Sequence, residues 1–360
     1  MRYTEQDVLS ALKGVVYFPK ANNIVDLDMV KDIKINDNEV AFTLLFEKTD
    51  DKGAAIVANA SEKTIKESLS SELLVKINVK FGDMDNDFGI SKVHNIVGVV
   101  SGKGGVGKST VAVNLALSIA KKGAKVGLID ADIYGPSVPI MLGLEDQRPR
   151  VINNGVKDII LPIEKYGIKI LSIGFFVDTD QALVWRGPMA ASALKQLFND
   201  TDWGDLDYLI IDFPPGTGDI QLTVVQEMAM TGAVVVSTPQ NVALADVKKA
   251  IQMFKQPKIN VPILGLIENM SYFTPPELPD NKYYIFGKDG CKNMAEEYGI
   301  TFLGGIPITE KTAACGDKGT PISLENDSVA KAFEKITEDL IKQVNIRNIK
   351  LPPTQKVDIK

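Results

Sequence analysis

The feature that most constrains this chain is a glycine-rich run at residues 102–109, which reads Gly-Lys-Gly-Gly-Val-Gly-Lys-Ser. It matches the pattern G-x-x-x-x-G-K-[ST], in which backbone N–H groups wrap a phosphate chain. Glycines are needed because side chains would block that approach and because some loop positions require positive φ. We expect Lys108 to contact the β- and γ-phosphates of a nucleotide and the Ser109 hydroxyl to ligate Mg²⁺. The residues expected around the phosphates are Gly102, Lys103, Gly104, Gly105, Val106, Gly107, Lys108, Ser109 and Thr110.

The residues on both sides of this run supply the context that a P-loop needs. Residues 96–100 predict a strand that leads into the loop, and residues 110–122 predict a helix that ends at Gly123. The N-terminus of that helix would add N–H donors and partial positive charge beside a bound anion. The order of strand, loop and helix therefore favours a nucleotide site over a glycine-rich turn without a ligand.

Short apolar runs alternate with helical segments from residue 95 onwards, which is typical of a parallel sheet with crossover helices. Several runs are apolar at consecutive positions, as expected for strands that are covered on both faces. We predict an α/β fold, a P-loop NTPase with a mostly parallel sheet flanked by helices. The predicted core strands cover residues 96–100, 125–129, 169–173, 208–211, 233–237 and 263–267.

The beginning of the chain predicts a small α+β domain of different organisation. Thr4 can cap a helix, and two alternating runs separated by a turn-rich tripeptide predict a hairpin. A further helix and a third strand complete the unit, and the acidic stretch after it lacks periodicity. The expected helices cover residues 5–12 and 52–70, and the expected strands cover 30–35, 39–46 and 73–79. We expect domains at 1–80 and 95–345, a linker at 81–94 and a C-terminal tail at 346–360.

Three aspartates follow the ends of two predicted strands. Asp130 and Asp132 follow one strand, and Asp212 follows another. Ligands of open α/β sheets bind beyond the carboxyl ends of the strands, so we expect these carboxylates near the phosphate loop. Asp212 and Asp130 are candidates, with Ser109, for holding Mg²⁺, and Asp132 is the candidate for orienting the attacking water. A turn or helix-cap role is the alternative for Asp132.

Composition limits the compartment and the partners that we expect. No run approaches the ~20 apolar residues of a membrane-spanning helix, and the N-terminus turns acidic without an apolar region. Together with a content of only two cysteines, this favours a cytoplasmic protein. A net charge of -6 argues against binding to nucleic acid or to an anionic membrane.

Several motifs together resemble one family of P-loop ATPases. Lys103, next to the first loop glycine, gives the "deviant" Walker A sequence of the MinD/ParA/nitrogenase-iron-protein group. Within that group the chain resembles the Mrp/ApbC (Nbp35-like) iron–sulfur cluster carriers over residues 95–345. The segments that carry the resemblance are Asp-Ala-Asp-Ile-Tyr-Gly-Pro-Ser at 130–137, Asp-Phe-Pro-Pro-Gly-Thr-Gly-Asp at 212–219 and Glu-Asn-Met-Ser at 268–271. The first 80 residues are similar to the MIP18-type (DUF59) domain that precedes many such ATPases.

The resemblance implies an ATP-hydrolysing homodimer that carries a [4Fe–4S] cluster, with apo iron–sulfur client proteins and an assembly scaffold as partners. It also implies that Lys103 acts catalytically with Lys108 by reaching across the two-fold axis to the phosphates of the other subunit. An extra cation supplied in this way stabilises phosphoryl-transfer charge as an arginine finger does. Asn269 would bond the adenine edge, and the segment that follows Pro307 would close over the base.

One departure from the family concerns the cluster ligands. Mrp carriers place a C-x-x-C pair just after the Glu-Asn-Met-Ser segment, so that two subunits supply four thiolates. Residues 272–279 read Tyr-Phe-Thr-Pro-Pro-Glu-Leu-Pro here and contain no cysteine. Cys291 and Cys315 doubled across a dimer would again total four thiols, but their spacing matches no ligand motif. Buried structural thiols are the alternative for both.

Two other functions stay open from the sequence. A MinD/ParA-like switch would bind membrane or DNA and would need a basic amphipathic C-terminal helix or a basic surface. Residues 328–344 predict an amphipathic helix, but Glu334, Glu338 and Asp339 accompany its lysines, which favours packing on its own domain. A P-loop enzyme that phosphorylates a small molecule would need an acceptor pocket, which residues 272–279 could line.

Overall fold

The computed structural model of the chain describes residues 3–36, 38–46, 51, 53–81, 89–153, 158–176, 187–354 and 356–357. The chain separates into two units, Met1–Asn86 and Asp87–Lys360. Each unit has a hydrophobic core of its own, and no residue belongs to both cores.

The N-terminal unit contains one three-stranded sheet in the order β3-β4-β5. β3 (Val30–Asn36) and β4 (Glu39–Phe46) pair antiparallel, as the predicted hairpin requires, and β5 (Leu74–Phe81) lies parallel to β4. Helix α1 (Glu5–Leu12) begins at a capping box formed by Thr4 and Asp7, which confirms the predicted N-cap. Helix α2 (Ala54–Ser68) packs against α1 and β5. The short elements β1 (Val16–Tyr17), η1 (Phe18–Lys20) and β2 (Asn22–Asn23) were not predicted.

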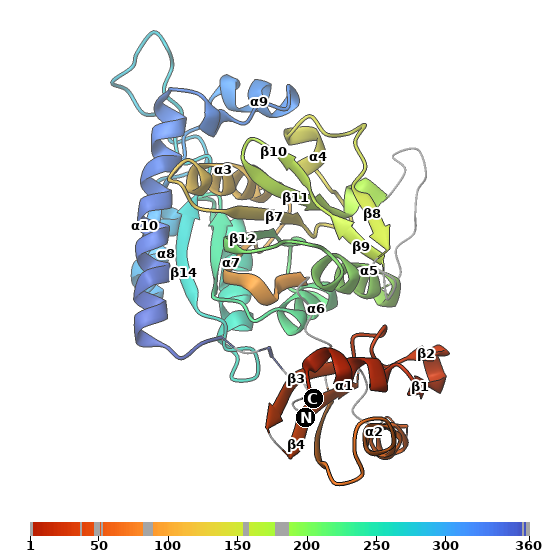
Figure 1. The fold of residues 1–360 in the computed structure, drawn as a ribbon. Coiled ribbons are helices and arrows are strands. Elements are labelled where there is room, and N and C mark those ends of the chain that lie inside the picture. The colour runs from red at the N-terminus through yellow and green to blue at the C-terminus, as the bar shows by residue number, and fades with distance from the viewer. Residues whose placement is uncertain are drawn as a thin grey trace. The chain divides into compact units, whose positions relative to one another are not determined.

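The larger unit is built on an eight-stranded sheet in the order β10-β11-β7-β12-β6-β13-β14-β15 (Figure 1). All of its pairings are parallel except that of β10 with β11. The prediction of an α/β fold with a mostly parallel sheet is therefore confirmed, and all six predicted core strands are present. The strands are β6 (Val93–Val100), β7 (Val126–Asp130), β10 (Ile163–Lys165), β11 (Ile168–Ser172), β12 (Leu206–Asp212), β13 (Gly232–Ser237), β14 (Ile263–Glu268) and β15 (Phe302–Gly305).

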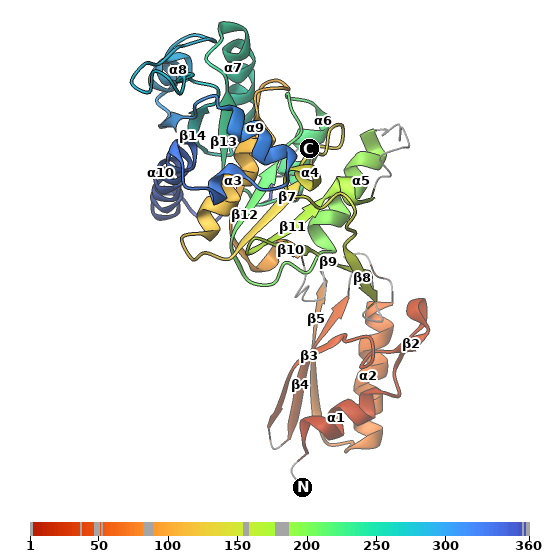
Figure 2. The same ribbon diagram turned by 90° about the horizontal axis from the view of Figure 1, so that it is seen from above.

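Helices cover both faces of this sheet because its parallel strands need crossover connections (Figure 2). The crossover through α3 runs in one direction across the sheet, and the crossovers through α5, α6 and α7 run in the other. Right-handed connections therefore place α3 on one face and the other three on the opposite face. Helix α10 packs against α3, and α8 packs against α7. The helices are α3 (Lys108–Ala120), α5 (Gly187–Asn199), α6 (Asp219–Glu227), α7 (Asn241–Lys255), α8 (Gly290–Tyr298) and α10 (Ser328–Lys350).

Shorter elements complete the unit. Helix α4 (Val138–Met141) follows β7, and α9 (Glu310–Asp317) follows β15. These two helices pack against each other. The remaining elements are β8 (Arg150–Asn153) and β9 (Asp158–Leu161), which pair antiparallel, and the 3-10 turns η2 (Gly89–Lys92), η3 (Ile173–Phe176) and η4 (Ile322–Leu324). No helix within the described ranges is both long enough and apolar enough to cross a membrane.

Two boundaries of this unit differ from expectation. Helix α10 continues to Lys350, so the expected tail at 346–360 begins as helix. The Asn348 amide donates to Asn95 Oδ1 at 2.8 Å, which holds these last turns against the sheet. At the other end, β6 begins inside the expected linker 81–94, so the last residues of that segment belong to the sheet.

Candidate functional site

The connection between β6 and α3 lies at the carboxyl edge of the sheet and has the backbone of a phosphate loop. Gly105 and Gly107 have φ of +79° and +81°, a region that residues with side chains disfavour. A Cβ at Gly102 would overlap the backbone of Asp246. The backbone therefore requires glycine at these three positions, two for conformation and one for close packing.

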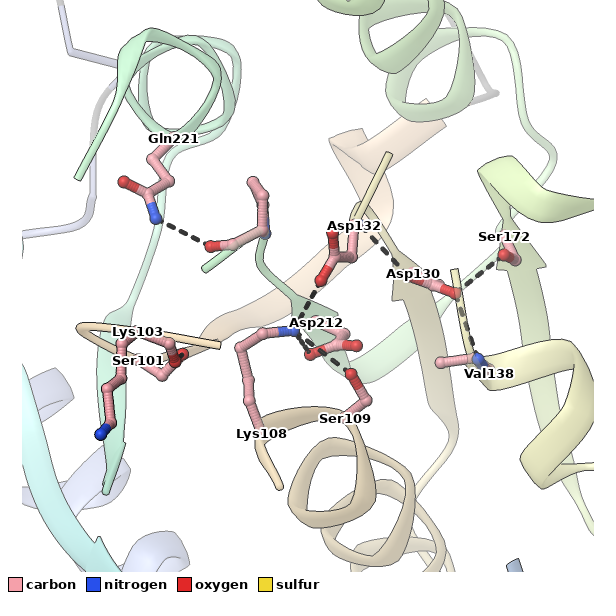
Figure 3. Close-up of polar contacts among 11 residues, drawn as sticks. Ser101, Lys103, Lys108, Ser109, Asp130, Asp132, Val138, Ser172, Asp212 and Gln221 are labelled. Carbon is pink, nitrogen blue, oxygen red and sulfur yellow. Dashed lines mark hydrogen bonds and ion pairs between the residues drawn. The ribbon is translucent and has the colours of Figure 1, made fainter. Parts of the chain in front are cut away.

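Lys108 lies at the centre of a polar cluster beside this loop (Figure 3). Its Nζ is 2.5 Å from Asp212 Oδ1 and 3.6 Å from Asp132 Oδ2. The Ser109 hydroxyl oxygen is 3.3 Å from the same Nζ. Only 6% of Lys108 is exposed, and Asp212 is completely buried. The structure thus brings together four side chains that the sequence placed on three different segments.

Two carboxylate oxygens of this cluster are buried without a hydrogen-bond partner among the described residues. They are Asp132 Oδ1 and Asp212 Oδ2. Burial raises the pKa of Asp212, and the Lys108 ammonium beside it opposes that rise. Burying a carboxylate oxygen without a donor is costly, and carboxylate and hydroxyl oxygens are ligands that Mg²⁺ accepts. The donor set, which includes the Ser109 hydroxyl, therefore fits a bound cation.

Asp130 is also buried, but its surroundings differ from those of Asp212. Its Oδ1 accepts a hydrogen bond from Asp132 N at 3.1 Å, and its Oδ2 accepts from Val138 N at 3.2 Å and from Ser172 Oγ at 2.9 Å. Burial, together with the charge of Asp212, raises the pKa of Asp130 to about 7. These bonds fix the turn that carries Asp132. A role for Asp130 as a Mg²⁺ ligand stays a prediction.

A hollow of about 230 Å³ lies over the loop and adjoins a larger cavity of about 630 Å³. The larger cavity lies within the range of roughly 300–1,000 Å³ that small-molecule sites occupy. The two spaces share the lining residues Gly107, Thr110, Ser137 and Met141. A molecule with a phosphate chain on the loop could therefore place the rest of its structure in the larger cavity.

Asn269 and Pro307 border the larger cavity. The Asn269 side chain is held by the phosphate loop, since its Nδ2 donates to the Val106 carbonyl at 2.8 Å. Its backbone N donates to the Ser237 carbonyl at 2.8 Å. Asn269 Oδ1 accepts no hydrogen bond from the described residues, so it is the atom of this side chain that a ligand could engage. Met270, which follows, has φ of +55°, a strained conformation for a long side chain.

Glu268 is a buried residue of the site for which sequence reasoning gave no separate role. Its Oε1 accepts a hydrogen bond from Ser271 Oγ at 2.5 Å, and its Oε2 accepts from Cys291 N at 2.8 Å. Glu268 therefore connects the end of β14, next to Asn269, to the first turn of α8. The signal was available in the sequence, because Glu268 ends an apolar strand just as Asp212 does.

Lys103 lies in the loop, but its side chain points away from the Lys108 cluster (Figure 3). Its carbonyl accepts a hydrogen bond from Ser101 Oγ at 2.9 Å. Within the described part of the chain, no ion pair involves its ammonium. Lys103 is therefore not part of the charge network that surrounds Lys108.

The two cysteines lie on different helices and are both buried. Cys291, in α8, is 0% exposed, and Cys315, in α9, is 8% exposed. Burial, reinforced by the charge of Glu268, raises the pKa of Cys291 to about 12. Across the described ranges, no three or more Cys, His, Asp or Glu side chains are grouped so that they could hold a metal ion. The structure does not bring the two thiols into a ligand cluster within one chain.

Comparison with protein families gives matches to both units. A family model described as NUBPL iron-transfer P-loop NTPase matches residues 92–341. A second, described as iron–sulfur cluster assembly protein, matches residues 5–78.

The chain is similar to bacterial proteins and to an archaeal protein whose structure has been solved. An iron–sulfur cluster carrier protein of Synechocystis is 40% identical over 349 residues, which is 95% of this chain and 98% of the relative. One from Aquifex aeolicus is 53% identical over 251 residues, or 69% of this chain and 67% of the relative. The structure of a nucleotide-binding protein from Archaeoglobus fulgidus in complex with ADP is 39% identical, with a TM-score of 0.57. That similarity covers 66% of this chain and 91% of the archaeal chain.

Proposed function

Because the chain belongs to the NUBPL iron-transfer P-loop NTPase family, we propose that it is an ATP-dependent carrier of iron–sulfur clusters. Both bacterial relatives described above are named iron–sulfur cluster carrier proteins. One observation carries the nucleotide part of the proposal. At the hollow over the phosphate loop, the buried Lys108 ammonium lies beside the carboxylates of Asp132 and Asp212, each of which has one buried oxygen that accepts no hydrogen bond from the described residues. Mg²⁺ and a triphosphate match this arrangement, since one supplies the cation and the other supplies the anion.

The binding mode follows from the positions of these groups. We propose that the amides of residues 102–109 hold the phosphates and that Lys108 turns from Asp212 to the β- and γ-phosphates. Ser109 and Asp212 would hold Mg²⁺, which when bound neutralises charge on the phosphates. The larger cavity would receive the adenosine between Asn269 and Pro307, with Asn269 Oδ1 facing the amino edge of the base.

Hydrolysis requires a water held in line with the γ-phosphate. Asp132 is the group proposed to orient that water, because its Oδ1 is buried and accepts no hydrogen bond from the described residues. Lys103 points away from its own cluster, so its proposed role in catalysis requires a second copy of the chain. We therefore propose a homodimer in which each Lys103 supplies positive charge to the phosphates bound by the other subunit.

The decisive experiment is an anaerobic cluster-transfer assay. A cluster-loaded scaffold protein is mixed with an apo-ferredoxin, and the gain of holo-ferredoxin is followed by circular dichroism. We expect the wild-type chain with ATP and Mg²⁺ to accelerate transfer, and Asp212→Asn, which keeps the side-chain shape but removes the charge, to lose this effect. ATP hydrolysis without any acceleration of transfer would favour the MinD/ParA-like switch. Absence of both activities would remove the proposal.

A further inference from the structure

The sequence contains only two cysteines, which limits how this chain can hold the iron–sulfur cluster that it is proposed to carry. Iron–sulfur clusters are held chiefly by Cys thiolates, and a [4Fe–4S] cluster takes four of them. We infer that the chain places no cluster on its own thiols and that the thiolates which hold the cluster belong to a second molecule bound to it. This inference rests on the proposed function and specifies how the cargo is held.

Cys291 is unsuited to bind iron where it lies. Its side chain is fully buried in the core, with Sγ 4.0 Å from the Thr238 carbonyl oxygen. Its backbone N donates to the buried carboxylate of Glu268, so an anionic thiolate would form close to another negative charge. Iron binds the thiolate, and the pKa of about 12 keeps this thiol protonated at neutral pH. Iron would have to open the core to reach it.

Cys315 belongs to the same hydrophobic core but to a different helix. Its carbonyl accepts a hydrogen bond from Thr320 N at 3.0 Å, which closes the turn after α9. A cluster shared by two copies would need both thiols of each copy at one common surface. Each thiol is instead buried inside its own copy, with 0% of Cys291 and 8% of Cys315 exposed.

Residues 272–284, which include the segment where the family resemblance implies cluster thiols, form an aromatic hairpin here. Phe273 and Tyr283 exchange two backbone hydrogen bonds of 2.8 Å each. The Tyr272 ring meets the Tyr284 ring edge-on, with centroids 6.5 Å apart, and Lys282 Nζ lies 4.2 Å from the Tyr272 centroid. Pairing, aromatic contact and a cation–π interaction thus hold the hairpin without a metal ion. The segment is an ordered structure in its own right, and none of its residues is a cysteine.

Cluster transfer on this chain is then a ligand exchange between thiols of other molecules. Each acceptor thiol loses its proton as its Fe–S bond forms, and each donor thiolate that is released takes up a proton. No electron is gained or lost, so the exchange needs no oxidant or reductant. Two sources provide the same thiolate chemistry, namely the cysteines of a partner protein and a small-molecule thiol such as glutathione.

The test uses the wild-type chain and the double variant Cys291→Ala/Cys315→Ala, which contains no thiol. Both are incubated anaerobically with ferrous iron and sulfide in a phosphine reductant, alone, with glutathione, or with an apo-ferredoxin. Iron that co-elutes with the chain is then measured. We expect neither protein to retain a cluster alone and both to retain it equally with a thiol source. Retention with glutathione identifies a small thiol as the ligand, and retention only with the ferredoxin identifies a protein. The inference would be overturned if the wild type retained a cluster without an added thiol source and the double variant did not.

Two further measurements keep the result interpretable. Circular dichroism and ATP turnover show whether the double variant is folded, and the iron content of the wild type without added thiol tests the inference independently of any variant. A cluster-transfer assay with both proteins distinguishes failure of this inference from failure of the proposed function. ATP-dependent transfer by the wild type that the folded double variant loses would refute the inference and keep the function. ATP hydrolysis without transfer by either protein would refute the function.

Discussion

The ammonium of Lys108 lies 2.5 Å from the carboxylate of Asp212, where the start of α3 meets the end of β12. Both side chains are buried, so each charge relies on the other for stabilisation. In the proposed nucleotide complex this pair would separate, because the phosphates would attract Lys108 and Asp212 would be left to hold Mg²⁺. The pair would then couple the stability of this part of the fold to the ligand state of the site.

Removing Lys108 should affect stability as well as activity. We expect Lys108→Met to abolish ATP turnover and to lower the free energy of unfolding of the nucleotide-free protein by about 3–5 kcal/mol, the range for a buried charge that loses its partner. Urea denaturation without nucleotide measures the second effect. The control Lys108→Met/Asp212→Leu should regain much of the stability but no turnover. Turnover at the wild-type level in Lys108→Met would contradict the site assignment.

Action of Lys103 on the other subunit predicts that two variants with impaired ATP hydrolysis rescue each other when they are mixed. Lys103→Ala lacks the cation supplied to the other subunit, and Asp212→Asn lacks a working site of its own. A mixed dimer contains one complete site, formed by Lys108 and Asp212 of the first variant and Lys103 of the second. We expect each variant alone to hydrolyse ATP slowly and their mixture to recover a substantial part of wild-type turnover. A mixture no faster than its components would show that Lys103 does not act across a dimer.

The carboxylates that end the strands could be located from the sequence because apolar runs mark where buried strands end. Asp130 pairs with Asp212 in the register of the neighbouring strands β7 and β12, which puts both residues at the same edge of the sheet. Their different environments could not be predicted, since Asp130 is bonded by Ser172 from a third strand. That contact depends on strand order, which the local pattern does not encode.

Other differences between prediction and structure have the same physical origin. Strands β10 and β15 have three and four residues, too few for a periodic signal, and they form because a sheet edge is available to pair with. The end of α10 is fixed by the contact between Asn348 and Asn95, which are far apart in the sequence. Likewise, the role of Glu268 becomes visible only when α8 is placed against β14. Local sequence therefore predicted the loop and the core strands better than the contacts between them.

Glu268 is expected to act as a positioning residue for Asn269, its neighbour in sequence. Glu268→Ala leaves the Cys291 N–H and the Ser271 hydroxyl without their buried acceptor, which should cost about 1–3 kcal/mol of stability. Displacement of Asn269 should also raise the KM for ATP more than it lowers kcat. Glu268→Gln can accept from Cys291 N and donate to the Ser271 oxygen, so it should restore both values. Thermal denaturation and ATPase kinetics test this, and equal effects of the two substitutions would contradict the hydrogen-bonding role.

The buried thiol of Cys291 predicts a dependence of stability on pH in the alkaline range. The pKa of this group is raised from 9.0 to about 12 on folding. Because the folded pKa is the higher one, the contribution of the thiol to stability is complete below pH 9 and decreases as the pH rises towards 12. Each pH unit in this interval should remove up to about 1.4 kcal/mol from the free energy of unfolding of the wild type. Cys291→Ala should show a correspondingly flatter pH profile, and Cys315→Ala is the matched control that retains the dependence. Urea denaturation at a series of pH values measures the difference, and parallel profiles for the wild type and Cys291→Ala would show that the thiol titrates normally in the folded protein.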